Sequence, residues 1–334
     1  MQTALYWEKY NNKVRCLLCP HNCIIAKGQS GICKVRINVD GQLVSSIYGE
    51  VTSLALDPIE KKPLYHFHPG SAILSIGTNG CNLACQFCQN WQFSQTGDSG
   101  RQKITSEEII KEALRVGSVG IAYTYNEPFI WYEFVLETAI KAKKAGLKNV
   151  LVTNGYVNNE PLVELLPFID AMNIDLKSFK KGFYKDVCNG DVSHVKNNII
   201  SAFKKCHIEI TNLIIPSKND TVAELEELAG WVASISPFIP VHLSRYFANY
   251  KMKIDPTAVL SLQKARDVLL KQLKYVYIGN VNIENNSNTY CPGCDKLLID
   301  RTNYAVKSIK VADGKCKYCG NAINGVFNEQ RQKP

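Results

Sequence analysis

Short apolar runs alternate with amphipathic stretches between residues 72 and 282. The apolar runs have the length of buried strands, and the stretches between them repeat apolar positions with the spacing of a helix face. This alternation is typical of βα units repeated around a parallel sheet. The predicted strands are AILSIG (72–77), GIAYTY (120–125), NVLVTN (149–154), AMNIDL (171–176), EITNLII (209–215), VHLSRYF (241–247) and YVYIGN (275–280).

Helix signals fill the intervals between these strands. Thr105 or Ser106 can cap a helix, and Gly146 ends another helix after a basic last turn. An α/β core is therefore predicted. The predicted helices are TSEEIIKEALRVG (105–117), PFIWYEFVLETAIKAKKAG (128–146), TVAELEELAGWVASI (221–235) and PTAVLSLQKARDVLLKQL (256–273).

Polar and ionisable residues collect at the ends of these strands. Ligand sites in such α/β folds form at the carboxyl ends of the strands, so we expect these residues to share one site with the cysteines that follow the first strand. They are Asn126, Glu127, Thr153, Asn154, Asp175, Lys177 and, on the sixth strand, His242.

The chain has thirteen cysteines, and eleven of them form three groups with the spacing of metal ligands. Cys188 and Cys206 stand outside these groups; Cys188 is a candidate hydrogen-atom relay or substrate contact, or simply a thiol without a role. The first group is Cys16, Cys19, Cys23 and Cys33, the second is Cys81, Cys85 and Cys88, and the third is Cys291, Cys294, Cys316 and Cys319.

The number of cysteines in each group indicates the kind of metal site. A tetrahedral ion takes four thiolates from short turns, so the third group is interpreted as a zinc ribbon, with a rubredoxin-like iron as the alternative. The first group suits either zinc or an auxiliary iron–sulfur cluster. The second group has three cysteines, the pattern of a cluster that leaves one iron for a ligand from outside the chain.

Composition narrows the class of protein. Apolar residues make up 46% and charged residues 21% of the 334 residues, and no apolar run reaches the length of about eighteen that a membrane span needs, so we expect a globular protein without membrane association. The first sixteen residues lack the features of a signal peptide, which favours a cytoplasmic location and reduced cysteines. The net charge of +9 is spread evenly, so nucleic acid is not the expected partner.

These motifs resemble the radical SAM superfamily, and within it the glycyl-radical activating enzymes such as that of pyruvate formate-lyase. The activating enzymes usually have two glycines before the glutamate, where this chain has Tyr125 and Asn126. Together with the N-terminal and C-terminal cysteine groups, the core most closely resembles the radical SAM enzyme of the AmmeMemoRadiSam system. The strings that carry the resemblance are RCLLCPHNCIIAKGQSGICKVR (15–36), GTNGCNLACQFCQNWQFS (77–94), TYNEP (124–128), TNGY (153–156), IDLK (174–177), CPGC (291–294) and CKYCG (316–320).

The resemblance implies a partial (β/α)6 TIM-like radical SAM barrel over residues 67–282, with an N-terminal Cys-rich segment (1–66) and a C-terminal zinc-ribbon or rubredoxin-like module (283–334). It implies that Cys81, Cys85 and Cys88 hold a [4Fe-4S] cluster whose fourth iron binds S-adenosylmethionine (SAM). One electron would then cleave SAM to a 5'-deoxyadenosyl radical that abstracts hydrogen from a substrate.

Roles for the other strand-end residues follow from the groups on SAM. Glu127 suits the methionyl ammonium, and Lys177 could offset the carboxylate. Asn126 and His242 are further candidate contacts of the cofactor. Thr153, Asn154 and Asp175 suit the ribose hydroxyls and nearby polar groups.

The resulting hypothesis is an activating-enzyme-like oxidoreductase that acts on a residue of a partner protein. Memo-type and Ammecr-type proteins are the implied partners, and flavodoxin or ferredoxin the implied electron donor. Two alternatives stay open at this point. One is a radical SAM enzyme that modifies RNA, and the other is an iron–sulfur and zinc scaffold or electron carrier without catalysis.

Overall fold

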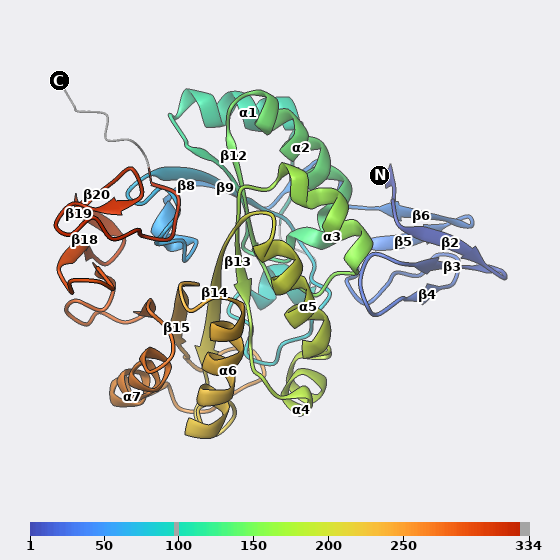
Figure 1. Cartoon of the computed structure of the whole chain (residues 1–334). Coiled ribbons are helices and arrows are strands. Elements are labelled where there is room, and N and C mark those ends of the chain that lie inside the picture. Colours follow the sequence, from blue (N-terminus) through green and yellow to red (C-terminus); the bar gives the residue numbers. More distant parts are fainter. Residues whose placement is uncertain (97–99, 328–334) are drawn as a thin grey trace.

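The computed structural model describes residues 1–96 and 100–327, and a mixed sheet lies at its centre (Figure 1). Among the described residues, this sheet has eight strands in the order β16-β15-β14-β13-β12-β11-β9-β8, with β8 antiparallel to β9 and all other neighbours parallel. All seven predicted strands are present, each within two residues of its predicted bounds. The strands are β8 (Ser53–Pro58), β9 (Ala72–Gly77), β11 (Gly120–Tyr123), β12 (Lys148–Thr153), β13 (Ala171–Asp175), β14 (His207–Ile214), β15 (Val241–Arg245) and β16 (Val276–Gly279).

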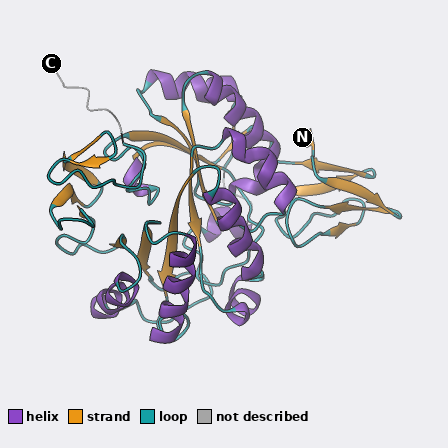
Figure 2. Cartoon of the chain, in the orientation of Figure 1, coloured by secondary structure: helices purple, strands orange, loops and turns teal. Residues whose placement is uncertain are grey.

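Helices cover one side of this sheet, as Figures 1 and 2 show. α1 begins with a capping box in which Thr105 and Glu108 exchange hydrogen bonds, as its sequence indicates. The predicted helix from residue 128 is instead a 3₁₀ turn followed by α2, because Pro128 and the Glu127 cap start a short turn. The helices are α1 (Ser106–Arg115), α2 (Tyr132–Lys144), α3 (Asn159–Leu165), α4 (Lys181–Phe183), α5 (Val192–Phe203), α6 (Val222–Ile235) and α7 (Val259–Leu270). Single turns are η1 (Ile59–Lys61), η2 (Gln92–Thr96), η3 (Pro128–Trp131), η4 (Leu166–Phe168) and η5 (Tyr184–Cys188).

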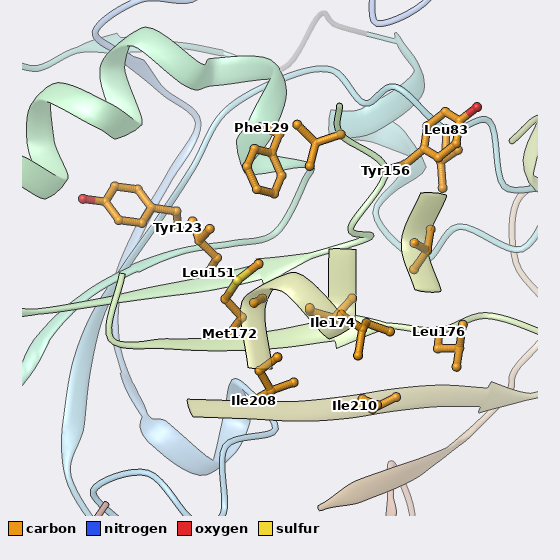
Figure 3. Packing of buried hydrophobic residues seen from close by; sticks show 14 of the residues in the cluster. Leu83, Tyr123, Phe129, Leu151, Tyr156, Met172, Ile174, Leu176, Ile208 and Ile210 are labelled. Carbon is orange, nitrogen blue, oxygen red and sulfur yellow. The ribbon is translucent and has the colours of Figure 1, made fainter. Parts of the chain in front are cut away.

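Residues alternate between the two faces of the sheet. Tyr123, Leu151, Met172 and Ile208 belong to the main core, and Figure 3 shows how such side chains from neighbouring strands pack together. Ala122 and other alternate residues face the opposite way and pack in a second cluster around the segment before β9. The sheet therefore has a helix-covered face and a second, inner face.

The strand order leaves β8 and β16 as the two edges of this described sheet. An α/β core is confirmed, whereas its closure as a partial (β/α)6 barrel stays a prediction. β8 lies before residue 66, so the central sheet takes in a strand that the sequence boundary assigns to the N-terminal segment. No helix in the described part of the chain is long and apolar enough to cross a membrane.

The N-terminal segment forms two small sheets beside the core. A buried ion pair, with 2.9 Å between Arg36 and Glu133 of α2, joins the segment to the core. The first sheet contains β1 (Gln2–Thr3), β5 (Arg36–Val39) and β6 (Gln42–Ser45), and the second contains β2 (Trp7–Tyr10), β3 (Lys13–Cys16) and β4 (Ile24–Ile25). A separate pair is β7 (Glu50–Val51) with β10 (Gln102–Lys103).

The C-terminal module lies on the other side of the core in Figure 1 and contacts both edges of the sheet. Arg301 is completely buried and pairs with Glu60, which follows β8. On the other edge, the hydroxyl of Tyr277 in β16 lies 2.8 Å from that of Thr289. The module thus spans the gap between β8 and β16. Its strands are β17 (Thr289–Tyr290), β18 (Leu297–Thr302), β19 (Ala305–Ile309), β20 (Val311–Ala312) and β21 (Lys315–Cys316).

Candidate functional site

A cavity of about 500 Å³ lies where the parallel strands end. This volume is within the range of small-molecule sites. Strand-end residues from β9 to β15 line the cavity, because the carboxyl ends of parallel strands meet at one edge of the sheet. The predicted residues that line it are Cys81, Cys85, Cys88, Asn126, Glu127, Thr153, Asn154, Asp175 and Lys177.

The loop that carries the three cysteines is held close to its neighbours. A Cβ on Gly77 would lie 2.6 Å from the carbonyl oxygen of Thr124, and one on Gly80, whose φ is +94°, would lie 2.8 Å from that of Cys33. Only glycine fits at both positions. The Asn126 side chain spans the start of the loop, accepting from the amide of Thr78 (3.1 Å) and donating to the carbonyl of Gly80 (3.0 Å). Asn126 therefore fixes the loop from the neighbouring strand end.

Hydrogen-bond donors point at the cysteine sulfurs. Cys81 Sγ accepts from the amide of Leu83 at 3.4 Å and from Asn154 Nδ2 at 3.6 Å, and Cys88 Sγ lies 3.2 Å from the Ser94 hydroxyl. Burial raises the pKa of the Cys81 thiol well above its usual value, and the Glu127 carboxylate raises it further. The thiolate therefore needs a nearby positive charge such as bound metal, and the surrounding donors suit that state.

Cys188 lies behind the cysteine loop. Its carbonyl accepts from the amide of Ala84 at 2.9 Å, and its thiol is hydrogen bonded to Cys85. This bond lowers the pKa of Cys85 against the effect of burial. Cys188 is completely buried and is not among the residues that line the cavity, so it is placed to support the loop.

Glu127 is a buried carboxylate held by donors from two strand ends. Its Oε1 accepts from the Thr153 hydroxyl (2.7 Å) and the Phe129 amide (3.0 Å), and its Oε2 accepts from the Asn154 amide (2.8 Å). Burial raises the pKa of Glu127 to about 7, although these donors act against the rise. A carboxylate has about four acceptor positions, so one position remains for a ligand in the cavity.

Asp175 and Lys177 form an ion pair at the end of β13, with 2.9 Å between their charged atoms. Burial alone would lower the pKa of Lys177, but Asp175, Cys85 and Cys188 outweigh it and raise that pKa well above its usual value. Lys177 thus stays cationic beside the cysteines.

A second ion pair at the cavity was missed by the sequence reasoning. Lys62, which lines the cavity, pairs with Asp57 of β8 at 2.8 Å, and the same carboxylate accepts from the Tyr125 hydroxyl at 2.7 Å. Tyr125 has a φ of +69°, the conformation that glycine adopts without strain. Glycine would suit this backbone, which agrees with its place in the activating-enzyme pattern, whereas Tyr125 adopts it against the usual preference of a bulky residue. The strand-end rule missed Asp57 and Lys62 because they precede β9.

The structure does not bring His242 to the cavity. Its Nε2 lies 2.6 Å from the buried carboxylate of Glu209, near the starts of the strands. His242 is the second residue of β15, and Ser244, two residues further along the same face, lines the cavity instead. The prediction gave the correct strand and face but the wrong end.

The outer cysteine groups differ in geometry. In the C-terminal group, Cys291 Sγ lies 3.6 Å from Cys319 Sγ, and Cys294 Sγ lies 3.8 Å from Cys316 Sγ. Four sulfurs bound tetrahedrally at about 2.3 Å from one zinc ion would stand about 3.8 Å apart, so these residues fit a single ion. The N-terminal cysteines instead line a small, mostly apolar cavity.

Comparison with known proteins agrees with this site. The family model of the radical SAM superfamily matches residues 75–232, so the chain contains a radical SAM superfamily domain. It is 43% identical to an uncharacterized protein of Methanocaldococcus jannaschii over 98% of this chain and 100% of that protein. A second protein of that organism, named as a candidate glycyl-radical enzyme activating enzyme, is 29% identical over 49% of this chain and 70% of its own length.

More distant relatives match a smaller share of the chain than the first of these proteins does. The pyruvate formate-lyase 1-activating enzyme of Escherichia coli is 28% identical over 32% of this chain and 46% of its own length. Among solved structures, Streptococcus suis SuiB bound to S-adenosylmethionine matches with a TM-score of 0.51 and 12% identity, over 66% of this chain and 53% of that one. This last likeness shows the fold alone.

Radical SAM proteins bind a [4Fe-4S] cluster and SAM. The residues present fit both groups: three cysteines with donors to their sulfurs share one cavity with a buried carboxylate and a buried lysine. The chain is therefore a radical SAM enzyme related to the glycyl-radical activating enzymes.

Proposed function

We propose that this enzyme cleaves SAM reductively and removes a hydrogen atom from a residue of a partner protein. The observation that carries the proposal is that Cys81, Cys85, Cys88, Glu127 and Lys177 meet in one cavity at the carboxyl ends of the strands. The bound cluster and SAM together supply the chemistry, an electron transfer that generates a carbon radical on the nucleoside.

The side chains divide the binding work. The three cysteines hold three irons, while Leu83 and Asn154 donate to the sulfur of Cys81. The remaining acceptor position of Glu127 suits the ammonium of SAM, and the cationic Lys177 suits its carboxylate. Asn126 and Thr153 act indirectly. The Asn126 side chain holds the cysteine loop, and the Thr153 hydroxyl holds the Glu127 carboxylate.

Aromatic and basic side chains near the cavity favour a protein substrate. Trp91, next to the cavity-lining Asn90, stacks on Tyr250 with ring centroids 5.4 Å apart, and the guanidinium of Arg245 lies over Phe247, which is 38% exposed. Such residues are enriched in protein interfaces. Activating-enzyme relatives are consistent with this substrate class.

The finer assignments follow the sequence hypothesis. The partner is a Memo-type or Ammecr-type protein, as in the AmmeMemoRadiSam system, and the electron donor is flavodoxin or ferredoxin. The C-terminal cysteines hold zinc, the sheet forms a partial barrel, and the enzyme works in the cytoplasm.

The test is anaerobic reconstitution with iron and sulfide, followed by dithionite and SAM, with 5'-deoxyadenosine measured by chromatography. We expect 5'-deoxyadenosine from the wild type and none from the variant in which Cys81, Cys85 and Cys88 are all alanine. Cys206→Ala, a half-buried thiol outside every group, is the matched control. Cleavage by the triple variant would overturn the cluster assignment.

The partner is tested separately by incubation with each candidate protein. A mass change or an organic radical signal in the EPR spectrum of one partner is expected. If 5'-deoxyadenosine forms but neither partner changes, the cleavage stands and the choice of partner is wrong.

A further inference from the structure

The N-terminal cysteines converge on one place although 17 positions separate the first from the last. Cys16 ends β3, Cys19 and Cys23 lie in the turn before β4, and Cys33 precedes β5. All four line a single small cavity whose other walls are mostly apolar, including Leu18, Ile25, Ile32 and Ile130. Of these walls, Leu18, Ile25 and Ile130 are buried, so on their side water is kept from bound metal.

The sulfurs of this group are arranged differently from those of the C-terminal group. In the described part of the chain, the sulfurs of the four C-terminal cysteines all lie within 4.8 Å of one another. The N-terminal four, which also lie in the described part of the chain, line one small cavity but do not meet this distance criterion. A cluster of several iron and sulfide atoms keeps its thiolates further apart than a single ion does, so this arrangement matches a cluster.

The inner side of the N-terminal group touches the loop that carries Cys81. The carbonyl oxygen of Cys33 lies 2.8 Å from the position that a Cβ on Gly80 would occupy. His21, two residues after Cys19, lies 2.7 Å through its Nε2 from the carbonyl oxygen of Asn82. These contacts fall on the residues immediately before and after Cys81, so the two cysteine sites are direct neighbours.

The outer side of the group reaches the surface. Cys16 and Cys33 are buried, whereas Cys19 and Cys23 are partly exposed. Beside them, the side chains of Ile24 and Ile32 are 47% and 43% exposed. A cluster held here would extend from the surface toward the cavity.

We propose that Cys16, Cys19, Cys23 and Cys33 hold a second iron–sulfur cluster, and that this cluster relays electrons to the one at Cys81, Cys85 and Cys88. A reduced carrier of the ferredoxin or flavodoxin class gives one electron to the N-terminal cluster. That electron then passes to the SAM-binding cluster, so the carrier is oxidised by one electron and no bond changes in the relay. The relay rests on the proposed function, whereas the cluster itself does not.

Metal content tests the site without any activity. We expect about eight irons and about one zinc per chain after anaerobic reconstitution. The variant with Cys19→Ala and Cys23→Ala is expected to lose about half of the iron and none of the zinc. These two cysteines are partly exposed, so their loss disturbs the core least. About four irons and two zincs in the wild type, or loss of zinc in this variant, would overturn the cluster.

Spectroscopy separates this site from the catalytic cluster. The variant with Cys81, Cys85 and Cys88 changed to alanine should keep about four irons and show the EPR signal of one reduced cluster after dithionite. Absence of that signal in a folded variant would refute the second cluster. If the signal is present and the wild type does not cleave SAM, the second cluster stands and the proposed function fails.

The relay is tested by the choice of reductant. In the Cys19→Ala, Cys23→Ala variant, SAM cleavage driven by reduced flavodoxin or ferredoxin should fall about tenfold further than cleavage driven by dithionite, which can reduce the remaining cluster directly. Cys206→Ala should show no such difference. Equal losses with both reductants would refute the relay and leave the cluster as a structural element.

Discussion

The two hydrogen bonds by which the Asn126 side chain holds the cysteine loop allow a quantitative test. Asn126→Asp keeps the size of the side chain and the acceptor for the Thr78 amide. It replaces the amide that donates to the carbonyl of Gly80 with an oxygen. Two acceptors then face each other at the distance of a hydrogen bond, 3.0 Å in the wild type. Asn126→Ala removes both bonds without adding this repulsion.

The expected magnitude follows from these contacts. A part-buried carbonyl that loses its donor costs about 1–3 kcal/mol, which is about 5- to 150-fold in an equilibrium between the ordered and displaced loop. We therefore expect iron to leave Asn126→Asp at least about fivefold faster than wild type when a chelator is added, with Asn126→Ala in between. Absorbance of the cluster follows the loss under anaerobic conditions. Equal rates of iron loss from all three proteins would refute the idea that Asn126 holds the cysteine loop.

Three further predictions concern stability. Burial holds the pKa of Glu127 at about 7, above the usual 4.5, so folding binds a proton between these pH values. The free energy of unfolding of the metal-free protein should therefore fall by about 3 kcal/mol as pH rises from about 4.5 to about 7. Urea unfolding of Glu127→Gln should show a smaller fall, and an equal fall would contradict the assignment. Arg36→Leu leaves Glu133 buried without its partner and should cost about 3–5 kcal/mol in urea unfolding, part of which the added change Glu133→Leu restores; no recovery in the double variant would argue against a charge effect. Cys316→Ala should abolish zinc binding and lower the melting temperature of the zinc-loaded protein, measured by calorimetry, and unchanged zinc content would refute the site.

The sequence predicted the scaffold of the site well because its signals are local. Each parallel strand is a short apolar run, and the residues at its end or just after it lie at the cavity edge, as Thr153 and Asp175 do at the ends of β12 and β13 and Glu127 does after β11. The expectation that His242 reaches the cavity differs from the structure for a related reason. Alternation along a strand fixes the face of a residue, but the position along β15 decides which end it reaches.

Contacts between distant segments lay beyond sequence reasoning. The Asp57–Lys62 pair reaches the cavity because β8 lies antiparallel to β9 and Tyr125 bends toward it. Likewise, the packing of Cys33 against Gly80 depends on how two segments far apart in sequence meet. No periodicity or spacing rule encodes such three-dimensional contacts.

The C-terminal module contacts both edges of the central sheet, and this has a consequence for the order in which the fold forms during synthesis. Glu60 and Tyr65 lie near the β8 edge, yet their partner Arg301 is translated more than two hundred residues later. At about 5–20 residues per second, a ribosome needs roughly 10–50 seconds to cover that interval. The last residue that lines the cavity, Ser244, is translated 57 residues before Arg301, which takes roughly 3–11 seconds at the same rate. For that part of the interval all cavity-lining residues have been made, while the C-terminal module does not yet join β8 and β16. The nascent chain thus passes through a stage in which the cysteine loop exists and the module that joins the sheet edges does not, which gives cluster insertion a period before the fold is completed.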